Sequence, residues 1–213
     1  MSIAERISRA SRTLIASLAL VLLAACADAP RPILEDPTSG FALYRSGRLS
    51  PTDLGFLCEI GVEEILVLDG DGENRECAFQ DKLCPGLTVR YNHAQNPDSP
   101  VTIDFLDAFD AWIADARTQG KKVAFRCRHG WHRTGRLAAY YRLRFEGASL
   151  EGVQQEMHRI GHLMWLHPTL DDQVAAYADL LAGRPCSVDP ENCPVEETDP
   201  GLASGYFPEN ACR

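Results

Sequence analysis

The sequence predicts an α/β fold with a central, mainly parallel sheet flanked by helices. Strand-like and helix-like segments alternate through the middle of the chain, which is the pattern of helices packed on a mainly parallel sheet. A short buried strand predicted over Lys121–Phe125 is also followed, after a loop, by a helix-like segment that opens at Gly135, as in a strand–loop–helix unit.

Further elements fit this plan. Buried strands are predicted over Ile65–Leu68 and Leu87–Tyr91. Ser99 and Pro100 form a favourable helix start, with Ser as the N-cap and Pro in the first turn. The apolar residues that then recur on one face are Leu106, Phe109, Ile113 and Ala116. A final helix is predicted over Leu170–Leu181, ending before a glycine.

The N-terminus has the features of a secretory signal. Three arginines precede an apolar run over residues 14–25 that is short for a membrane span. The residues Leu23-Ala24-Ala25-Cys26 resemble a bacterial lipoprotein box, in which the signal peptide is cut before a cysteine that is then lipidated. A buried hydrophobic helix and an ordinary cleaved signal are the alternatives. The lipoprotein interpretation predicts export and anchoring through Cys26 on the periplasmic or outer face of a bacterial membrane.

Differences in composition divide the rest of the chain into a tether, a folded domain and a C-terminal extension. After a signal over 1–25, residues 26–40 are rich in Pro with Asp and Glu and are expected to form a flexible tether. Residues 41–183 hold the predicted strands and helices, and residues 184–213 form a Cys/Pro-rich extension expected to lie over the domain surface. The net charge of −9 argues against nucleic acid as a partner. A monomer is expected.

Cysteine usage agrees with export. Apart from Cys26 and Cys127, the cysteines are Cys58, Cys77, Cys84, Cys186, Cys193 and Cys212. They suffice for three disulfides, and many pairings are possible. Intervening turn residues favour Cys77 with Cys84 and Cys186 with Cys193, which leaves Cys58 with Cys212. A metal site is the alternative, but no Cys-x2-Cys pair or well-placed His supports one, so no metal is expected.

The run from Cys127 to Arg133 has the make-up of a phosphate-binding loop. Such a turn can aim successive backbone N–H groups at one anion, while the guanidinium of Arg133 binds two of its oxygens. The same positive field favours the Cys127 thiolate. A strand before the loop and a helix after it place the anion at a helix N-terminus. The run therefore predicts a nucleophilic thiolate in a phosphate site.

These residues resemble the His-Cys-x5-Arg-Ser/Thr signature of the cysteine-dependent protein tyrosine phosphatase superfamily, in its small, bacterial dual-specificity-phosphatase-like branch. Leu43–Arg48 resembles the opening of that branch, and Ser149–Gly161 with His167-Pro168 resembles its tail, so the similarity covers about residues 41 to 182. Arg126 stands where the family has His, although an Arg there still favours a thiolate. The resemblance implies a phosphatase domain over 41–183 with the dual-specificity phosphatase-like fold.

The resemblance also implies a metal-independent phosphomonoester hydrolase without a cofactor. Cys127 would attack phosphorus and form a phosphocysteine that water later hydrolyses. Arg133 and the loop amides would bind the phosphoryl oxygens. Thr134 matches the family hydroxyl that hydrogen-bonds the sulfur, and an ordinary helix N-cap is its structural alternative.

Two residues are candidates for the general acid. The family acid is an Asp on a loop before the nucleophile, and Asp98 lies in a matching place. An alternative alignment puts Gln95 at that site, and Asp98 would then cap the helix expected after it. The rival is His132, because the run from Gly130 to Thr134 resembles the Gly-Trp-Asp-Arg-Thr loop of myotubularin lipid phosphatases, and His donates protons near neutral pH.

The loop is cationic on an acidic chain. Its basic residues are Arg126, Arg128, His129, His132, Arg133 and Arg136. Such a pocket favours a highly anionic substrate, so phosphoproteins and inositol phosphates are the expected substrates. The predicted substrate-binding residues are Arg128, His129, Gly130, Trp131, His132 and Arg133. The alternative function is a catalytically weak phosphate- or phosphoinositol-binding module with the same loop.

Overall fold

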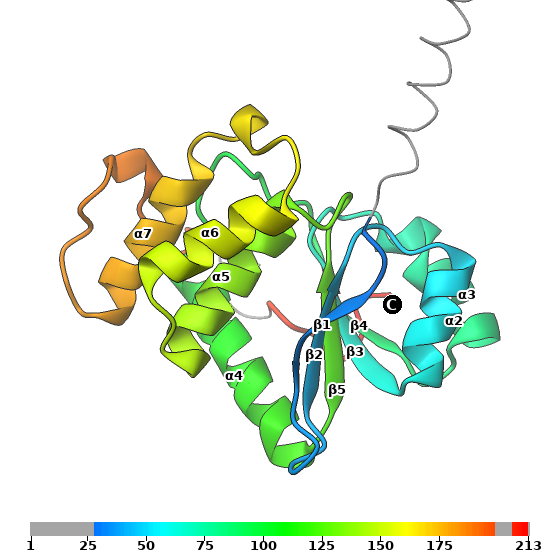
Figure 1. The fold of residues 1–213 in the computed structure, drawn as a ribbon. Helices are drawn as coiled ribbons and strands as arrows, with labels where there is room; N and C mark the ends of the chain where they lie inside the picture. Colours follow the sequence, from blue (N-terminus) through cyan, green and yellow to red (C-terminus); the bar gives the residue numbers. More distant parts are fainter. Residues whose placement is uncertain (1–27, 199–205, 213) are drawn as a thin grey trace, which may run out of the picture.

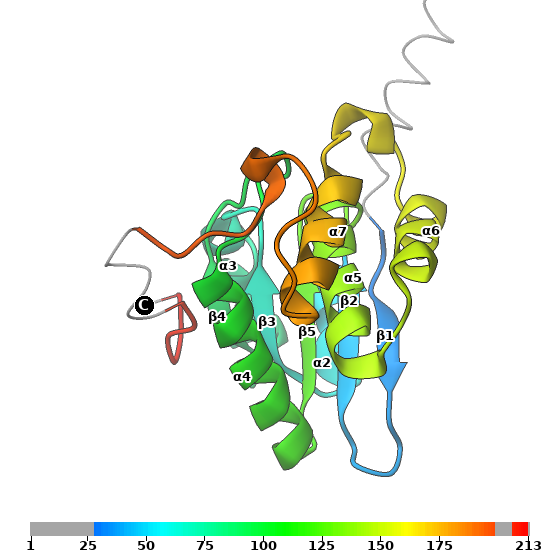
Figure 2. The same ribbon diagram turned by 90° about the vertical axis from the view of Figure 1, so that its left-hand side faces the viewer.

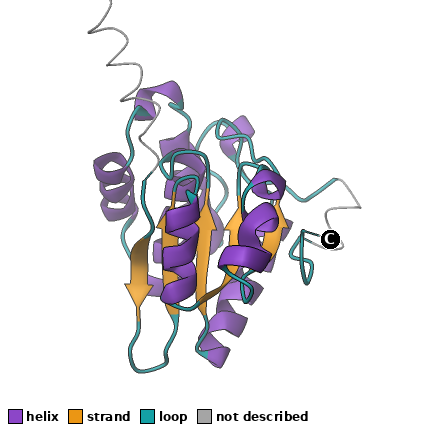
Figure 3. Ribbon diagram, turned by 90° about the vertical axis from the view of Figure 1, so that its right-hand side faces the viewer, coloured by secondary structure: helices purple, strands orange, loops and turns teal. Residues whose placement is uncertain are grey.

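The computed structural model describes residues 28–198 and 206–212. A five-stranded sheet in the order β1-β2-β5-β3-β4 lies between two layers of helices (Figure 1). The strands are β1 (Arg31–Glu35), β2 (Ala42–Ser46), β3 (Val62–Val67), β4 (Thr88–Asn92) and β5 (Lys122–Arg126). Strands β2 to β5 pair in parallel and β1 pairs antiparallel with β2 (Figure 3). The predicted α/β fold with a mainly parallel sheet is confirmed.

Helices cover both faces of the sheet. The two on one face are α2 (Pro51–Glu59) and α3 (Glu76–Leu83) (Figure 1). The four on the other are α4 (Ile103–Gln119), α5 (His132–Glu146), α6 (Leu150–Ile160) and α7 (Leu170–Leu181) (Figure 2). Short 3-10 turns are η1 (Gly72–Asn74), η2 (Met164–Leu166) and η3 (Pro190–Asn192).

Alternation along the strands fills both layers of the core. In β5, Val123 and Phe125 pack among the residues of α4 and α5, whereas Ala124 packs toward α2. Successive strand side chains point to opposite faces of the sheet, so a strand covered on both sides is apolar throughout. This packing fixes the carboxyl end of β5, where the Cys127 loop begins.

The predicted helix starts need correction. Helix α4 begins at Ile103 with Thr102 as its N-cap, not at Ser99. Ser99 stays in the loop because its carbonyl accepts a hydrogen bond from Arg136, and because a residue before proline disfavours the helical conformation. Helix α5 begins at His132, before the predicted start, so the residues that follow Trp131 are already helical.

Part of the segment predicted to be a flexible tether is a strand. Within residues 26–40, β1 pairs with β2, and Ile33 is buried in the core. Pro32 is tolerated because an edge strand leaves some N–H positions unpaired. The signal predicted over 1–25 and Cys26 lie outside the described residues. In the part of the chain that the structure covers, no helix is both long and apolar enough to cross a bilayer.

The described parts of the C-terminal extension pack on the domain. The Ile103 amide donates to the carbonyl of Val195 at 2.9 Å. Tyr206 and Phe207 lie edge-on to Phe105, with ring centroids 5.7 and 5.6 Å from it. The extension therefore contributes aromatic side chains to the core on the α4 side of the sheet.

The six cysteines form three disulfides, and the structure corrects two of the predicted pairings. Cys186 bonds to Cys193 as predicted, but Cys58 bonds to Cys84 and Cys77 bonds to Cys212. Cys77 and Cys84 lie at opposite ends of α3. Seven residues of helix separate their Cα atoms by about 10 Å, beyond the span of a disulfide. Helix α2 instead brings Cys58 beside Cys84.

Candidate active site

The Cys127 loop connects β5 to α5 and is wrapped around the sulfur atom. Cys127 is almost fully buried, and the amide of Gly130 donates to its Sγ at 3.3 Å. Gly130 has φ +82°, and an added Cβ would lie 2.7 Å from the amide nitrogen of Gly47. Only glycine suits this left-handed, tightly packed position. The glycine in the motif therefore lets the chain close over the thiol.

Neighbouring groups bind the outer side of the loop. The carbonyl of Arg128 accepts from the Arg48 amide at 3.1 Å, and that of His129 from the Asp28 amide at 3.0 Å. The carbonyl of Gly130 accepts from Arg45 Nη2 at 2.7 Å. In a trans peptide the next N–H points opposite the carbonyl. The amides of residues 129–131 therefore face inward, toward the sulfur.

The start of α5 adds further donors. The first helical bond in this stretch runs from the Gly135 amide to the Trp131 carbonyl at 2.9 Å, so the preceding amides have no intrahelical acceptor. No acidic residue stands in the first turn of the helix. The positive end of the helix dipole therefore faces the loop without a competing carboxylate, as an anion site requires.

Arg133 lies in that first turn and keeps its terminal nitrogens available. Its Nε donates to the Gln95 carbonyl, which fixes the side chain against the β4–α4 loop. Its two Nη groups form no bond to another residue in the described ranges. A guanidinium held at Nε and open at both Nη atoms suits bidentate binding of an oxyanion.

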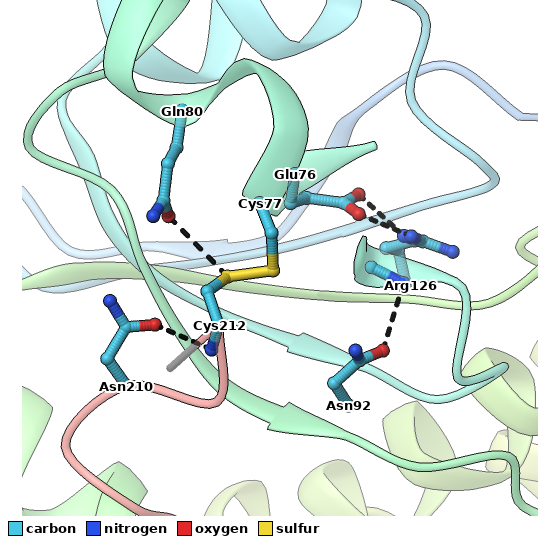
Figure 4. Close-up of a disulfide and its surroundings, with 8 residues drawn as sticks. Glu76, Cys77, Gln80, Asn92, Arg126, Asn210 and Cys212 are labelled. Atoms are coloured by element: carbon cyan, nitrogen blue, oxygen red, sulfur yellow. Dashed lines mark hydrogen bonds and ion pairs between the residues drawn. A yellow bond between two sulfur atoms is a disulfide. The ribbon is translucent and has the colours of Figure 1, made fainter. Parts of the chain in front are cut away.

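Arg126 does not serve the loop as a free cation. It is fully buried, with Nε 2.7 Å from Glu76 Oε1 (Figure 4), and it pairs also with Asp69 and Asp71. Burial alone lowers the pKa of Arg126, but these carboxylates raise it overall. Three carboxylates surround the positive charge of Arg126. Arg126 therefore does not supply the unpaired positive charge that was expected next to Cys127.

Another buried arginine, Arg45 on β2, contacts the Cys127 loop directly, as was expected of Arg126. Arg45 is almost fully buried and binds the carbonyl of Gly130. Burial lowers its pKa to about 10, and the nearby Cys127 opposes that shift. Arg45 is therefore still a cation at neutral pH. Arg45 thus places a buried positive charge against the loop that holds Cys127.

Asp98 lies on the β4–α4 loop and is bound to His167. Its Oδ1 is 2.6 Å from His167 Nδ1, and its side chain is half exposed. Two buried side chains hold this loop: Arg136 binds the Ser99 carbonyl, and Gln173 donates to the Pro97 carbonyl at 3.1 Å. Arg136 is thus a scaffold residue and does not belong to the cationic pocket.

The other candidate acid lies beside this pair. The His132 ring is centred 4.4 Å from that of His167, and its Nε2 lies 3.0 Å from the His162 carbonyl. Burial, together with the neighbouring His167, lowers the pKa of His132 to about 4. His132 is therefore neutral near pH 7, and its ring N–H faces the His162 carbonyl.

The remaining predicted residues occupy distinct places. His129 stacks on Trp131 with ring centroids 5.0 Å apart, and Trp131 is buried against His162. Arg128 is exposed. Thr134 is fully buried in α5, and its Oγ1 has no hydrogen-bond partner among the described residues. The expected bond from Thr134 to the sulfur is therefore not formed, and Trp131, not Thr134, is the helix N-cap.

Sequence reasoning missed Arg45, Glu76 and the pair Asp69 and Asp71. Asp69 and Asp71 lie two and four positions after the buried parallel strand β3, and Cys127 directly follows β5. Side chains at the carboxyl ends of neighbouring parallel strands meet at one edge of the sheet. The position of these aspartates after a buried parallel strand is the sequence feature that could have predicted them as partners of Arg126.

Comparison with known proteins agrees with this fold. No protein-family model matches the chain. A structure of TpbA from P. aeruginosa in complex with pTyr is similar, with a TM-score of 0.52 and 18% identity over 71% of this chain and 95% of that one. Tk-PTP in its active form has a TM-score of 0.51 and 19% identity over 67% and 95%. The chain therefore has the α/β fold of these phosphatases.

Proposed function

We propose that this protein is a metal-independent phosphomonoester hydrolase that uses Cys127 as its nucleophile. One observation carries the proposal: the Cys127 sulfur sits inside a loop whose amides face inward, with the open guanidinium of Arg133 at the start of the next helix. Such an array can hold three phosphoryl oxygens around an attacking sulfur. The similarity of fold to TpbA and Tk-PTP supports the same reaction class.

The proposed reaction has two steps. In the first, the Cys127 thiolate forms an S–P bond while the ester P–O bond breaks, and the leaving oxygen takes a proton from Asp98. In the second, water attacks the phosphocysteine, Asp98 accepts a proton from that water, and the S–P bond breaks to release phosphate and the thiolate. Arg133 binds the equatorial oxygens throughout.

Phosphoproteins and inositol phosphates are the proposed substrates. TpbA was solved with pTyr bound, which supports an aryl phosphomonoester for the related fold. The exposed Arg128 and the ring of His129 stand at the pocket and suit additional anionic groups. We also propose that Cys26 is lipidated and holds the domain on the outer or periplasmic face of a membrane.

Turnover of p-nitrophenyl phosphate in the presence of a chelator tests the enzyme proposal. Cys127→Ser should abolish hydrolysis, and Arg133→Lys should reduce it by a factor of about 10² or more, because an ammonium cannot replace the two-pronged guanidinium. Arg184→Lys is the matched control, since Arg184 is exposed and pairs with Asp179 instead. No hydrolysis by the folded wild-type protein would contradict the proposal.

The second candidate is a phosphate-binding module with weak or no turnover. The unpartnered hydroxyl of Thr134 favours it, because that group makes no bond to the sulfur that would assist release of the thiolate. Calorimetric binding of inorganic phosphate without hydrolysis, lost in Arg133→Lys, is the result that this alternative predicts.

A further inference from the structure

The connection between α6 and α7 is fixed to the catalytic loop at both of its ends. At one end, His162 accepts a bond from His132 at 3.0 Å through its carbonyl, and its ring is centred 4.8 Å from that of Trp131. At the other end, His167 lies against His132 and binds Asp98. Residues 162–167 therefore form a defined rim beside the pocket, which we call the α6–α7 rim.

Three of the four side chains between those two histidines are large, apolar and exposed. Leu163, Trp165 and Leu166 are 42%, 74% and 46% exposed. Leu163 has φ +56°, and in the described parts of the chain no other residue besides glycine has a positive φ. A leucine rarely adopts this left-handed conformation. The fold thus keeps a strained turn and three large apolar groups in solvent next to the pocket.

The start of the described chain is fixed to the same loop. The Asp28 amide donates to the His129 carbonyl at 3.0 Å, and the Gly47 amide donates to the Asp28 carbonyl at 2.7 Å. Cys26 precedes Asp28 by two positions, and two residues span at most about 7 Å. A lipid anchor at Cys26 would therefore begin at the edge of the pocket. The α6–α7 connection and the start of β1 lie at the same end of the molecule (Figures 1 and 2).

Unpaired positive charges accompany these apolar groups. Arg128 in the loop and Arg159 in the last turn of α6 are exposed, and neither forms an ion pair with another described residue. Of the nearby acidic groups, Asp98 contacts His167 and Asp171 contacts His158, whereas Asp172 is exposed and forms no ion pair with another described residue. Exposed tryptophan and unpaired arginine suit the interface of an anionic bilayer.

We propose that the α6–α7 rim, together with the chain start at Asp28, docks on a lipid bilayer, so that the pocket opens onto the headgroup region. Leu163, Trp165 and Leu166 enter the interface, and Arg128 and Arg159 face the anionic headgroups. The docking depends on the proposed anchor at Cys26 for its strength and does not depend on turnover. An anchor this close to the pocket leaves the domain little freedom to turn away from the membrane.

Quenching of tryptophan fluorescence by brominated phospholipids tests this orientation. The full-length acylated chain is reconstituted into vesicles of phosphatidylcholine and phosphatidylglycerol, with and without bromine on the acyl chains. Trp112 and Trp131 are buried, and Trp165→Phe supplies their background signal. The control places a tryptophan by Thr38→Trp in the Trp165→Phe chain. Thr38 is exposed in the β1–β2 hairpin, at the opposite end of the sheet (Figure 1).

The expected result is a loss of Trp165 emission in brominated vesicles and no loss for the control tryptophan. Equal emission of Trp165 in both vesicle types, equal quenching of the control, or a chain that does not float with the vesicles overturns the proposal. Mass spectrometry of the acyl groups and hydrolysis of p-nitrophenyl phosphate in the same samples report the anchor and the enzyme separately. If Trp165 is quenched but the protein does not hydrolyse p-nitrophenyl phosphate, the docking surface is supported and the hydrolase proposal is contradicted.

Discussion

Asp98 and His167, which lie 69 positions apart, are joined by a 2.6 Å contact between carboxylate Oδ1 and imidazole Nδ1. The pair joins two connections, β4–α4 and α6–α7, whose neighbouring residues are held by Arg136, Gln173 and His132. A carboxyl group positioned in this way can deliver a proton to a leaving oxygen and recover one from water.

Asp98→Asn should lower kcat by about 10²-fold for a phosphomonoester with a poor leaving group, because the departing oxygen would lack its proton donor. The loss should be smaller for p-nitrophenyl phosphate, whose leaving group needs less help. Steady-state kinetics with both substrates measures the difference. Asp171→Asn is the control, since Asp171 forms a similar pair with His158. Unchanged rates with both substrates would remove Asp98 from the mechanism.

Neutral His132 should make the folded state sensitive to acid. Its pKa is about 4 in the folded protein against an ordinary value of 6.5. The unfolded chain therefore binds a proton at intermediate pH while the folded chain does not, so this contribution is complete above about pH 6.5 and is lost as the pH falls toward 4. The loss should be about 2 kcal/mol after allowance for solvent screening.

Urea unfolding of wild type and His132→Gln at pH 7 and pH 4.5 isolates that contribution. The free energy of unfolding should fall less steeply with acid in the variant than in the wild type. His93→Gln provides the comparison, because His93 is exposed, and it should keep the wild-type slope. Parallel pH dependence of all three proteins would show that His132 titrates normally.

The sequence predicted strands β3, β4 and β5, the strand–loop–helix unit around Cys127 and the final helix, because each depends on local patterns. Lys121–Phe125 is an apolar strand, and Gly130 marks a turn that only glycine fits. The partner of Arg126 could not be predicted in the same way, because Glu76 lies 50 positions away on helix α3. Asp98 was predicted from the resemblance to the phosphatase family, but its bond to His167 depends on how two loops meet.

Charges were the least predictable part of the site. The basic residues of the motif appear equivalent in sequence, yet Arg126 and Arg136 are buried and bound to protein groups, whereas Arg133 keeps open donors. Two of the predicted disulfide pairings were wrong for a related reason. Nearness in sequence favoured Cys77 with Cys84, but a helix holds them apart, and the fold brings the chain terminus to Cys77 instead.

Arg126→Met should destabilise the protein by about 3 to 5 kcal/mol, because it leaves the fully buried Glu76 without its cation. Chemical denaturation gives this cost directly. Arg144→Met removes a half-exposed pair with Asp110 and should cost less than about 1 kcal/mol. The combined change Arg126→Met with Glu76→Leu should recover part of the loss. Equal stability of Arg126→Met and wild type would mean that Glu76 is protonated or hydrated in solution.

The two bridges of the C-terminal extension should differ in their contribution to stability. Cys77–Cys212 spans 135 positions, and Cys186–Cys193 spans 7 (Figure 4 shows the former). The entropy of the closed loop in the unfolded chain gives stabilisations of about 5 and about 2.5 kcal/mol, respectively. Each pair is replaced by serines, and the free energies of unfolding are compared without reductant. A larger loss from the short bridge would show that native contacts, and not the length of the closed loop, determine how the extension stabilises the domain.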